Sequence, residues 1–342
     1  MGDVVTIFNR KGQPLAEVDG AVTRSWRLER TIDTSKGQMS IAYNSEKVNS
    51  FTMRYGNIVL VESNDGLPNW AGIIWPRTHS QNGIIKLTLM SAEWLFAMRA
   101  TDGKDVWNGS MATTFITLLH LANRYWPLPI SPDPVISDDG RQLNNEWNAI
   151  VILDALNELA NETNHFWWLE PERKSDGNLW FIPHLEKRTG RRFGQTLIEN
   201  SNMGDVQLVE EPTDLANIIT GYGRFDDWAF PIEYTGRNNQ SIGKYGQIQA
   251  PEFFLNRSTV NGLIAPVEAA LERRTPYLSL TATMTEKPYP RAGDQVFCNF
   301  APIHGFLLVG RPDIIPMRCT SVDYSPDDNT PIITASEIVE IS

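Results

Sequence analysis

The sequence predicts an α+β protein that is mainly β, with two β modules and an α+β unit inserted between them. Three observations support this prediction. Apolar side chains alternate along residues 1–105, they follow helical spacing between 106 and 200, and strand-like runs separated by turn residues return after 200. At 342 residues the chain exceeds what one hydrophobic core usually supports, which agrees with several domains.

The first β module is expected over residues 1–105. Met39, Ile41 and Tyr43 alternate with polar or small residues, which is the pattern of a half-buried strand. Ile85, Leu87 and Leu89 repeat the pattern. Turn residues separate the runs at 35–37, 55–57, 64–66 and 81–83, so we expect a small antiparallel barrel or sandwich. A short helix is expected within 91–100, with Trp94, Leu95 and Met98 on one face.

The α+β unit is expected over residues 106–200. Ser110 is the predicted N-cap of a helix whose apolar residues continue to a stop at Trp126-Pro127. A second amphipathic helix is expected over about 148–161. Two aromatic strands follow, at 166–169 and 179–182, joined by a turn at 174–177, and they predict a hairpin packed against the helices.

Strands are expected again after residue 200. The segment 201–235, including a strand over 216–222, is expected to complete the first module. The second β module is then expected over 236–342, with one helix at 262–274. We interpret Gly221-Tyr222-Gly223 as a strand end that turns tightly, the polar stretch 236–245 as turn-rich, and 221–246 as the boundary between modules. Gly293-Asp294 is expected to be a turn inside the second module.

Composition limits the class of protein. The 41 acidic residues exceed the 30 basic ones and give a formal charge of −11, which disfavours stable, sequence-independent binding of nucleic acid. A pore that DNA must cross without sticking would instead have acidic walls. No apolar run reaches the roughly 18 residues that span a bilayer, and the N-terminus lacks the apolar core of a signal peptide, so no membrane anchor is expected. Met1-Gly2 with Thr6 matches a myristoylation pattern, but the apolar residues around Thr6 favour a strand.

Cysteine, histidine and basic residues give no strong signal of a site. Cys298 and Cys319 are expected to be partly buried, reduced thiols, although their redox state stays open. The histidines are scattered without a pair at metal-ligand spacing, at positions His79, His120, His165, His184 and His304. The one dense basic cluster flanks Gly190 and is interpreted as a solvated turn; its members are Lys187, Arg188, Arg191 and Arg192.

Eleven tryptophans keep a carbohydrate-binding or carbohydrate-active alternative open, because sugars stack on aromatic faces. A platform would come from Trp167, Trp168 and Trp180, with Glu170, Glu172, Asp226 and Asp227 as candidate carboxylates. The other interpretation places these rings in the core or in contacts between protomers. No nucleophile elbow or phosphate loop is present, and Gly221-Tyr222-Gly223 lacks the third glycine of a dinucleotide site. We therefore predict no catalytic, cofactor-binding or metal-binding residues and no enzyme activity.

The order of these elements resembles that of the tail hub, or baseplate hub, proteins of long-tailed bacteriophages. The resemblance covers most of the chain, and its ordered set of motifs is more specific than any one of them. The motifs are the strand 70–74 before the short helix 93–99, the helix 153–160 before an aromatic strand, the segment 215–223 with Asn217, the turn 244–246, and Gly293-Asp294.

This resemblance implies two tube-like antiparallel β-barrel modules per chain and a homotrimeric ring, because three chains with two similar surfaces each can meet a six-fold tail tube. It further implies that the chain is a virion component of the tail tip, made in the host cytoplasm, without a cofactor. The implied partners are a distal tail or tail tube protein, a tape-measure protein and tail-tip fibre or spike proteins, with DNA only in transit. Many hubs continue into a needle or hydrolase, whereas this chain stops soon after its second β module, so any such activity is expected in another chain. The sequence leaves open whether the parent particle is a phage, a prophage remnant or a related injection device.

Overall fold

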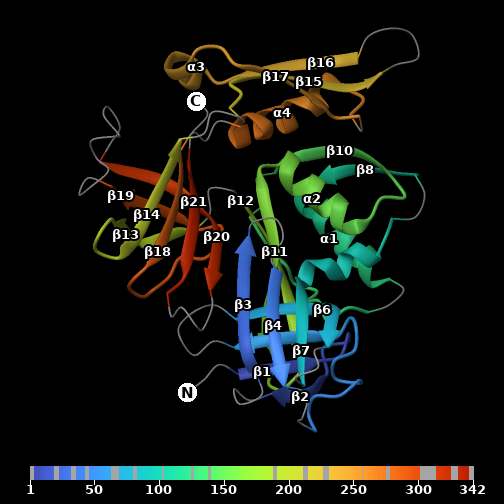
Figure 1. Ribbon diagram of the computed structural model, residues 1–342. Helices are drawn as coiled ribbons and strands as arrows, with labels where there is room; N and C mark the ends of the chain where they lie inside the picture. Colours follow the sequence, from blue (N-terminus) through green and yellow to red (C-terminus); the bar gives the residue numbers. More distant parts are fainter. Residues whose placement is uncertain are drawn as a thin grey trace.

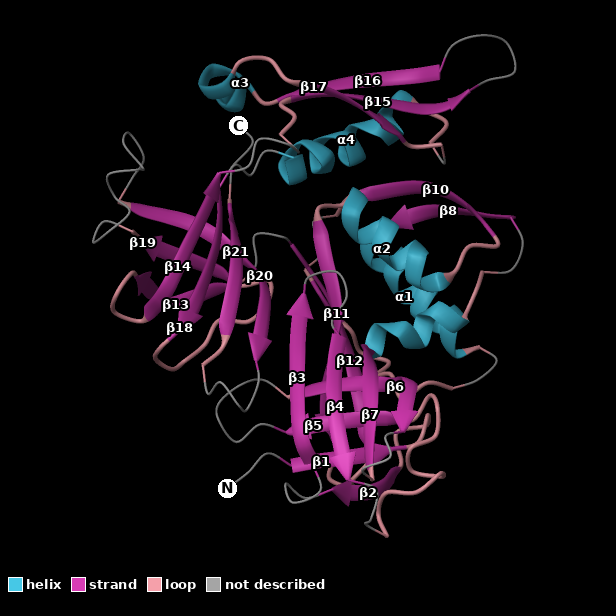
Figure 2. Ribbon diagram, in the orientation of Figure 1, coloured by secondary structure: helices cyan, strands magenta, loops and turns pink. Residues whose placement is uncertain are grey.

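The computed structural model describes most of the chain. The described residues are 4–18, 23–31, 36–42, 46–62, 69–79, 83–101, 104–124, 127–137, 140–187, 191–210, 215–225, 231–255, 257–274, 278–300, 313–324 and 330–338. Strands predominate over helices throughout these ranges (Figure 2). The prediction of a mainly β, α+β protein is therefore confirmed. No helix among the described residues combines the length and the apolar character needed to cross a membrane.

The N-terminal module is an antiparallel sheet that curls on itself, so that β1, β5 and β6 cross β3, β4 and β7 (Figure 1). Met39, Ile41, Ile85, Leu87 and Leu89 all lie in its buried core, as their alternation predicts. The strands are β1 (Val4–Phe8), β2 (Pro14–Val18), β3 (Thr23–Thr31), β4 (Lys36–Ala42), β5 (Ile58–Glu62), β6 (Trp70–His79) and β7 (Ile84–Ser91).

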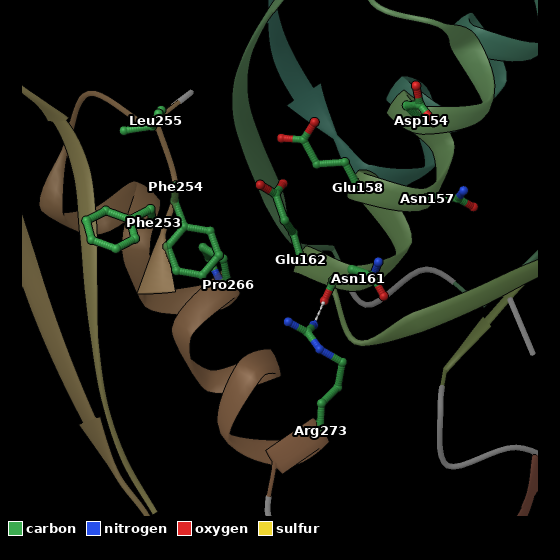
Figure 3. A pocket seen from close by; sticks show the side chains of 10 residues that line it. All are labelled: Asp154, Asn157, Glu158, Asn161, Glu162, Phe253, Phe254, Leu255, Pro266 and Arg273. Atoms are coloured by element: carbon green, nitrogen blue, oxygen red, sulfur yellow. Dashed lines mark hydrogen bonds between the residues drawn. The ribbon is translucent and has the colours of Figure 1, made fainter. Parts of the chain in front are cut away.

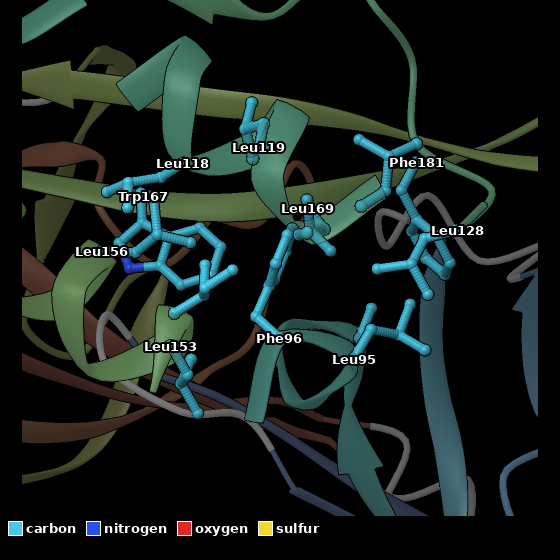
Figure 4. Close-up of a cluster of buried hydrophobic side chains, with 14 of the residues drawn as sticks. Leu95, Phe96, Leu118, Leu119, Leu128, Leu153, Leu156, Trp167, Leu169 and Phe181 are labelled. Carbon is cyan, nitrogen blue, oxygen red and sulfur yellow. The ribbon is translucent and has the colours of Figure 1, made fainter. Parts of the chain in front are cut away.

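The α+β unit follows, and its helices pack on one side of an aromatic hairpin (Figure 2). Ser110 caps α1 as predicted, because its hydroxyl accepts a hydrogen bond from the backbone N–H of Thr113. The large core of this unit includes Phe96, Trp167 and Phe181 (Figure 4). Its elements are η1 (Ala92–Met98), β8 (Lys104–Ser110), α1 (Met111–Asn123), β9 (Val135–Ile136), β10 (Gln142–Asn148), α2 (Ile152–Glu162), β11 (His165–Arg173) and β12 (Leu179–Lys187).

The C-terminal module is a second β unit with its own core. Cys298 and Cys319 lie there without a disulfide between them, and both are fully buried, whereas partial burial was expected. Burial raises the pKa of Cys298 to about 12 and raises that of Cys319 further, so both are protonated at neutral pH. The strands are β13 (Arg192–Ile198), β14 (Met203–Glu210), β18 (Leu278–Met284), β19 (Gln295–Asn299), β20 (Ile314–Tyr324) and β21 (Ile332–Glu337).

Backbone pairing joins the two β modules into one 13-stranded sheet. Strand β20 pairs antiparallel with β3, with Ser321 opposite Thr31 and Tyr324 opposite Leu28. The aromatic hairpin lies beside this junction (Figure 1). It also contacts the C-terminal module, because the ring of Phe166 packs so closely on Gly293 that a Cβ there would lie 2.6 Å from Phe166 Cζ.

A small unit, which we call the 215–274 unit, stands apart from both β modules (Figure 1). Its three-stranded sheet packs against α4, and Ile219, Val267 and Leu271 lie in the core between them. Asn217 ties the sheet together, since its side chain donates to the Gly246 carbonyl at 2.6 Å and accepts from the Ile248 N–H at 2.8 Å. The elements are β15 (Ile218–Phe225), β16 (Pro231–Arg237), α3 (Asn239–Tyr245), β17 (Gln249–Phe253) and α4 (Val260–Arg274).

Several expectations differ from the structure. Helix α4, expected in the second module, belongs to the 215–274 unit, and β13, expected in the α+β unit, pairs with β19 of the C-terminal module. Strand β14 pairs with β18 of the C-terminal module, and β15 belongs to the 215–274 unit, whereas both were expected to complete the first module. Gly221 and Gly223 lie inside β15 and are not a tight turn. Their lack of a side chain instead makes room for neighbours, because a Cβ on Gly221 would lie 2.3 Å from Val267 Cγ2. Within the stretch expected to be turn-rich, 239–245 forms α3, which Asn238 caps through a hydrogen bond from the Ser241 N–H.

Candidate functional site

A cavity of about 580 Å³ lies between helix α2 and the 215–274 unit (Figure 3). We call it the α2–α4 cavity. Both of its walls come from elements whose positions are fixed by packing, since α2 contributes to the large core and also packs on α4. Its lining residues are Asp154, Asn157, Glu158, Asn161 and Glu162 from α2, Phe253, Phe254 and Leu255 at the end of β17, and Pro266 and Arg273 from α4.

The two walls differ in character. Asp154, Glu158 and Glu162 follow at intervals of four residues, so their carboxylates lie on one face of α2. Opposite them are two strongly exposed apolar side chains, Phe253 at 62% and Leu255 at 60% relative exposure, with the half-buried Phe254 between them in sequence. The cavity therefore pairs an acidic face with an apolar one.

A buried ion pair fixes the 215–274 unit to the end of α2. The guanidinium of Arg257 contacts the Glu162 carboxylate, and the two side chains are only 2% and 5% exposed. Burial lowers the pKa of Arg257 to about 10, and the negative charge of Glu158 opposes this shift. Arg273 adds a second link by donating to the Asn161 carbonyl oxygen at 2.8 Å.

Two buried tryptophans orient the polar side chains of α2. The indole N–H of Trp147 donates to Glu158 Oε2, and that of Trp167 donates to Asn157 Oδ1, each at 2.9 Å. Among the described residues that line the cavity there is no serine, cysteine or histidine, and its ionisable groups are three carboxylates and the Arg273 guanidinium. The arrangement is suited to binding.

The three tryptophans considered for a sugar platform do not share one face of the hairpin. Trp167 is 4% exposed and belongs to the large core, where it makes edge-on contacts with Phe96 and Phe115 (Figure 4). Trp168, the next residue of β11, points to the opposite face of the hairpin, as alternation along a strand requires. It lies on the same face as Trp180, yet its ring is stacked on Phe166 and His184.

His184 of the hairpin lies between two carboxylates. Its Nε2 lies 2.9 Å from Glu170 Oε2 and its Nδ1 lies 3.7 Å from Glu186 Oε1. Burial acts to lower the pKa of His184, but the carboxylates of Glu170 and Glu186 beside the ring outweigh it and raise the pKa. Arg291 of the C-terminal module also contacts Glu170, at 3.7 Å, so the cluster lies where hairpin and module meet.

The remaining residues singled out in the sequence have structural partners or lie outside the described ranges. His165 is buried between the carbonyl oxygens of Thr163 and Ser137, and His120 is exposed on α1. In the basic cluster, Arg191 contacts Asp294 and Arg192 lies over the Phe297 ring. Glu172 pairs with Lys174. Met1, Gly2, Arg188, Gly190, Asp226, Asp227 and His304 lie outside the described residues, and so does the side chain of His79. The described part of the chain contains no cluster of three potential metal ligands.

Sequence reasoning missed the α2–α4 cavity. The carboxylates at 154, 158 and 162 are visible as a four-residue repeat, and 253–255 is an apolar run after a polar strand. Nothing in the sequence indicates that these two segments, about one hundred residues apart, face each other. The Arg257–Glu162 pair that holds them has a separation of 95 residues.

Several solved protein structures have a similar fold. No protein-family model and no curated protein matches the chain. Among solved structures, a prophage tail protein from Listeria monocytogenes superposes with a TM-score of 0.64 at 13% identity, over 97% of this chain and 94% of that one. A tail protein from Neisseria meningitidis superposes with a TM-score of 0.65 at 14% identity, over 100% of this chain and 98% of that one. The fold is that of phage tail proteins.

The phage tail fold also occurs in a more distant neighbour. The Escherichia coli c3393 protein, a component of the type VI secretion system with structural similarity to the T4 tail proteins gp27 and gp5, superposes with a TM-score of 0.55 at 8% identity. The match covers 93% of this chain and 74% of that one. At these identities the likeness concerns the fold alone, and it spans the β modules as well as the units between them.

Proposed function

We propose that this chain is the structural hub protein of a phage-type tail and a component of the virion tail tip. The observation that carries the proposal is the end-to-end match with two tail proteins, over 97% and 100% of this chain and nearly all of theirs. Two proteins that shared only one domain would match over that domain and not over nearly the whole of both chains. In this proposal the protein is made in the host cytoplasm and has no enzyme activity of its own.

The hub assembles as a homotrimeric ring that joins the six-fold tail tube to the tail tip. Each chain contributes two β modules, so three chains offer six tube-like surfaces to a six-fold partner. The β20–β3 pairing supports this role, because it joins the two modules of one chain edge to edge into a continuous sheet. The expected partners are a distal tail or tube protein, a tape-measure protein, and fibre or spike proteins.

DNA passes through the ring without binding to it. The formal charge of −11 supports a lumen that repels the phosphate backbone. A structure of the assembled ring with most acidic side chains on its outer surface would overturn this part of the proposal.

The mass in solution tests the assembly directly. Light scattering after size exclusion is expected to give three times the protomer mass of 38.6 kDa, and negative-stain images are expected to show rings with an open centre. Immunogold labelling of purified particles is expected at the tail tip. A chain that stays monomeric at tens of micromolar, and that is missing from the particles, would contradict the proposal.

A further inference from the structure

Two of the most exposed large apolar side chains among the described residues, Phe253 and Leu255, lie at the α2–α4 cavity. Eleven large hydrophobic residues are exposed among the described residues, and three of them, Phe253, Leu255 and Val260, lie within eight residues of sequence. Scattered exposed apolar residues are normal on protein surfaces, but a cluster of this kind at a cavity marks a binding surface. Phe253 and Leu255 line the cavity itself.

The facing wall carries three carboxylates, of which Arg257 already neutralises one, and Arg273 also lines the cavity. Asp154, Glu158 and Glu162 stack along one face of α2, and like charges four residues apart repel each other. Arg257 is paired with Glu162 at the C-terminal end of the helix. At the other end Asp154 is exposed and makes no hydrogen bond or ion pair in the described part of the chain. A cation bound near Asp154 would offset this repulsion.

The aromatic rings favour the same kind of occupant. Figure 3 shows the rings of Phe253 and Phe254 across the cavity from Glu158 and Glu162. Aromatic faces attract cations, and they also accommodate the aliphatic stem of a lysine or arginine. The cavity thus combines carboxylates for the charged group with apolar surface for the flanking side chains.

We propose that the α2–α4 cavity is a docking site for another tail protein, and that it receives a lysine or arginine side chain flanked by apolar residues. This inference rests on the proposed function, because the partner is a protein of the same particle. It assigns the attachment of that partner to the 215–274 unit and α2, away from the sheet that joins the two β modules.

Photo-crosslinking in assembled tails tests the inference. Phe253 is replaced by p-benzoylphenylalanine in the full chain, and Phe51, which has the same 62% exposure but lies in the N-terminal module, is replaced in a matched control. Crosslinks from 253 are expected in a segment of another tail protein that contains lysine or arginine among apolar residues, and none in that segment from 51. Crosslinks from 253 only to other copies of this chain, or to acidic segments, would overturn the inference.

Charge substitutions at Asp154 provide a second test of the docking site. Asp154→Lys is expected to reduce the crosslink from 253 by about tenfold or more, because a like charge replaces an attraction, and Asp154→Asn by less. Asp133→Lys, at an exposed aspartate outside the cavity, is the control and is expected to leave the crosslink unchanged. An unchanged crosslink in Asp154→Lys would overturn the inference. The abundance of the chain in purified tails separates the two proposals: absence from tails contradicts both, whereas presence without the expected crosslink contradicts only the docking site.

Discussion

The imidazole of His184 lies parallel to the indole of Trp168, with ring centroids 4.5 Å apart and ring planes inclined by 10°. Glu170 and Glu186 flank this imidazole, and Arg291 approaches Glu170 from the C-terminal module. The stack therefore places a titratable group next to the contact between hairpin and module. Its protonation state is coupled to the stability of that contact.

Stability is expected to fall as the pH rises through the pKa of His184. The folded pKa is raised above the ordinary value of about 6.5, so the folded state binds the proton more tightly than the unfolded state. The stabilisation is fully present below 6.5 and is lost as the pH passes the folded pKa. Urea unfolding between pH 6 and 9 measures this slope. His184→Gln should reduce it, whereas His120→Gln, at an exposed position on α1, should leave it unchanged.

Gly12→Ala is expected to destabilise the protein by about 2–4 kcal/mol. Gly12 has φ +79°, and a Cβ there would lie 2.1 Å from the Leu179 carbonyl oxygen. The Gly12 carbonyl also accepts the Leu179 N–H at 2.8 Å, so the substitution disturbs the contact between the β1–β2 turn and β12. Gly177→Ala is the matched control, because Gly177 has φ +83° with no atom within 4 Å, and about 1–2 kcal/mol is expected there. Equal losses of unfolding free energy would argue against the steric contribution.

Gly221→Ala is expected to destabilise the 215–274 unit by about 1–3 kcal/mol through overpacking. The added methyl group would meet Val267 Cγ2 and the Phe254 ring, which pack α4 and the end of β17 on β15. Combining it with Val267→Ala should recover part of the loss, so the double-mutant cycle is expected to be non-additive. Gly194→Ala, at a site with open space, should change the unfolding free energy by less than about 0.5 kcal/mol.

Glu162→Gln is expected to cost about 3–5 kcal/mol, because it removes the carboxylate that contacts the buried Arg257 guanidinium. Replacing both partners, as Glu162→Leu with Arg257→Met, should cost much less than the two single changes together. Thermal and urea unfolding measure the four free energies. A double variant as unstable as the sum of the singles would show that the two residues act independently.

Local patterns in the sequence predict where helices and strands lie better than they predict which strands pair. The Ser110 cap, the alternation at Met39 and Ile41, and the hairpin over 166–182 each depend on neighbours within a few residues, and the structure confirms them. Strand pairing depends on contacts far along the chain. The pairing of β14 with β18 and of β20 with β3 joins segments with no shared signal in the sequence.

The glycines show the same distinction. Gly221 and Gly223 were interpreted as turn residues because glycine often serves that purpose locally. Glycine is needed at these two positions because Val267, Ile232 and the Arg257 carbonyl approach the backbone closely, which only the folded chain reveals. The carboxylates of the cavity and the apolar run 253–255 are likewise visible in the sequence, but the fact that they face each other is not.

The β20–β3 junction also determines how the protein would respond to mechanical tension. Hydrogen bonds between residues 28–31 and 321–324 bring segments near the two ends of the chain into one ladder. A pull on one β module is therefore shared with the other through the sheet as well as along the intervening polypeptide. The two β modules would therefore resist tension as one continuous sheet. Proteolytic cleavage between them would leave the β20–β3 backbone pairing in place.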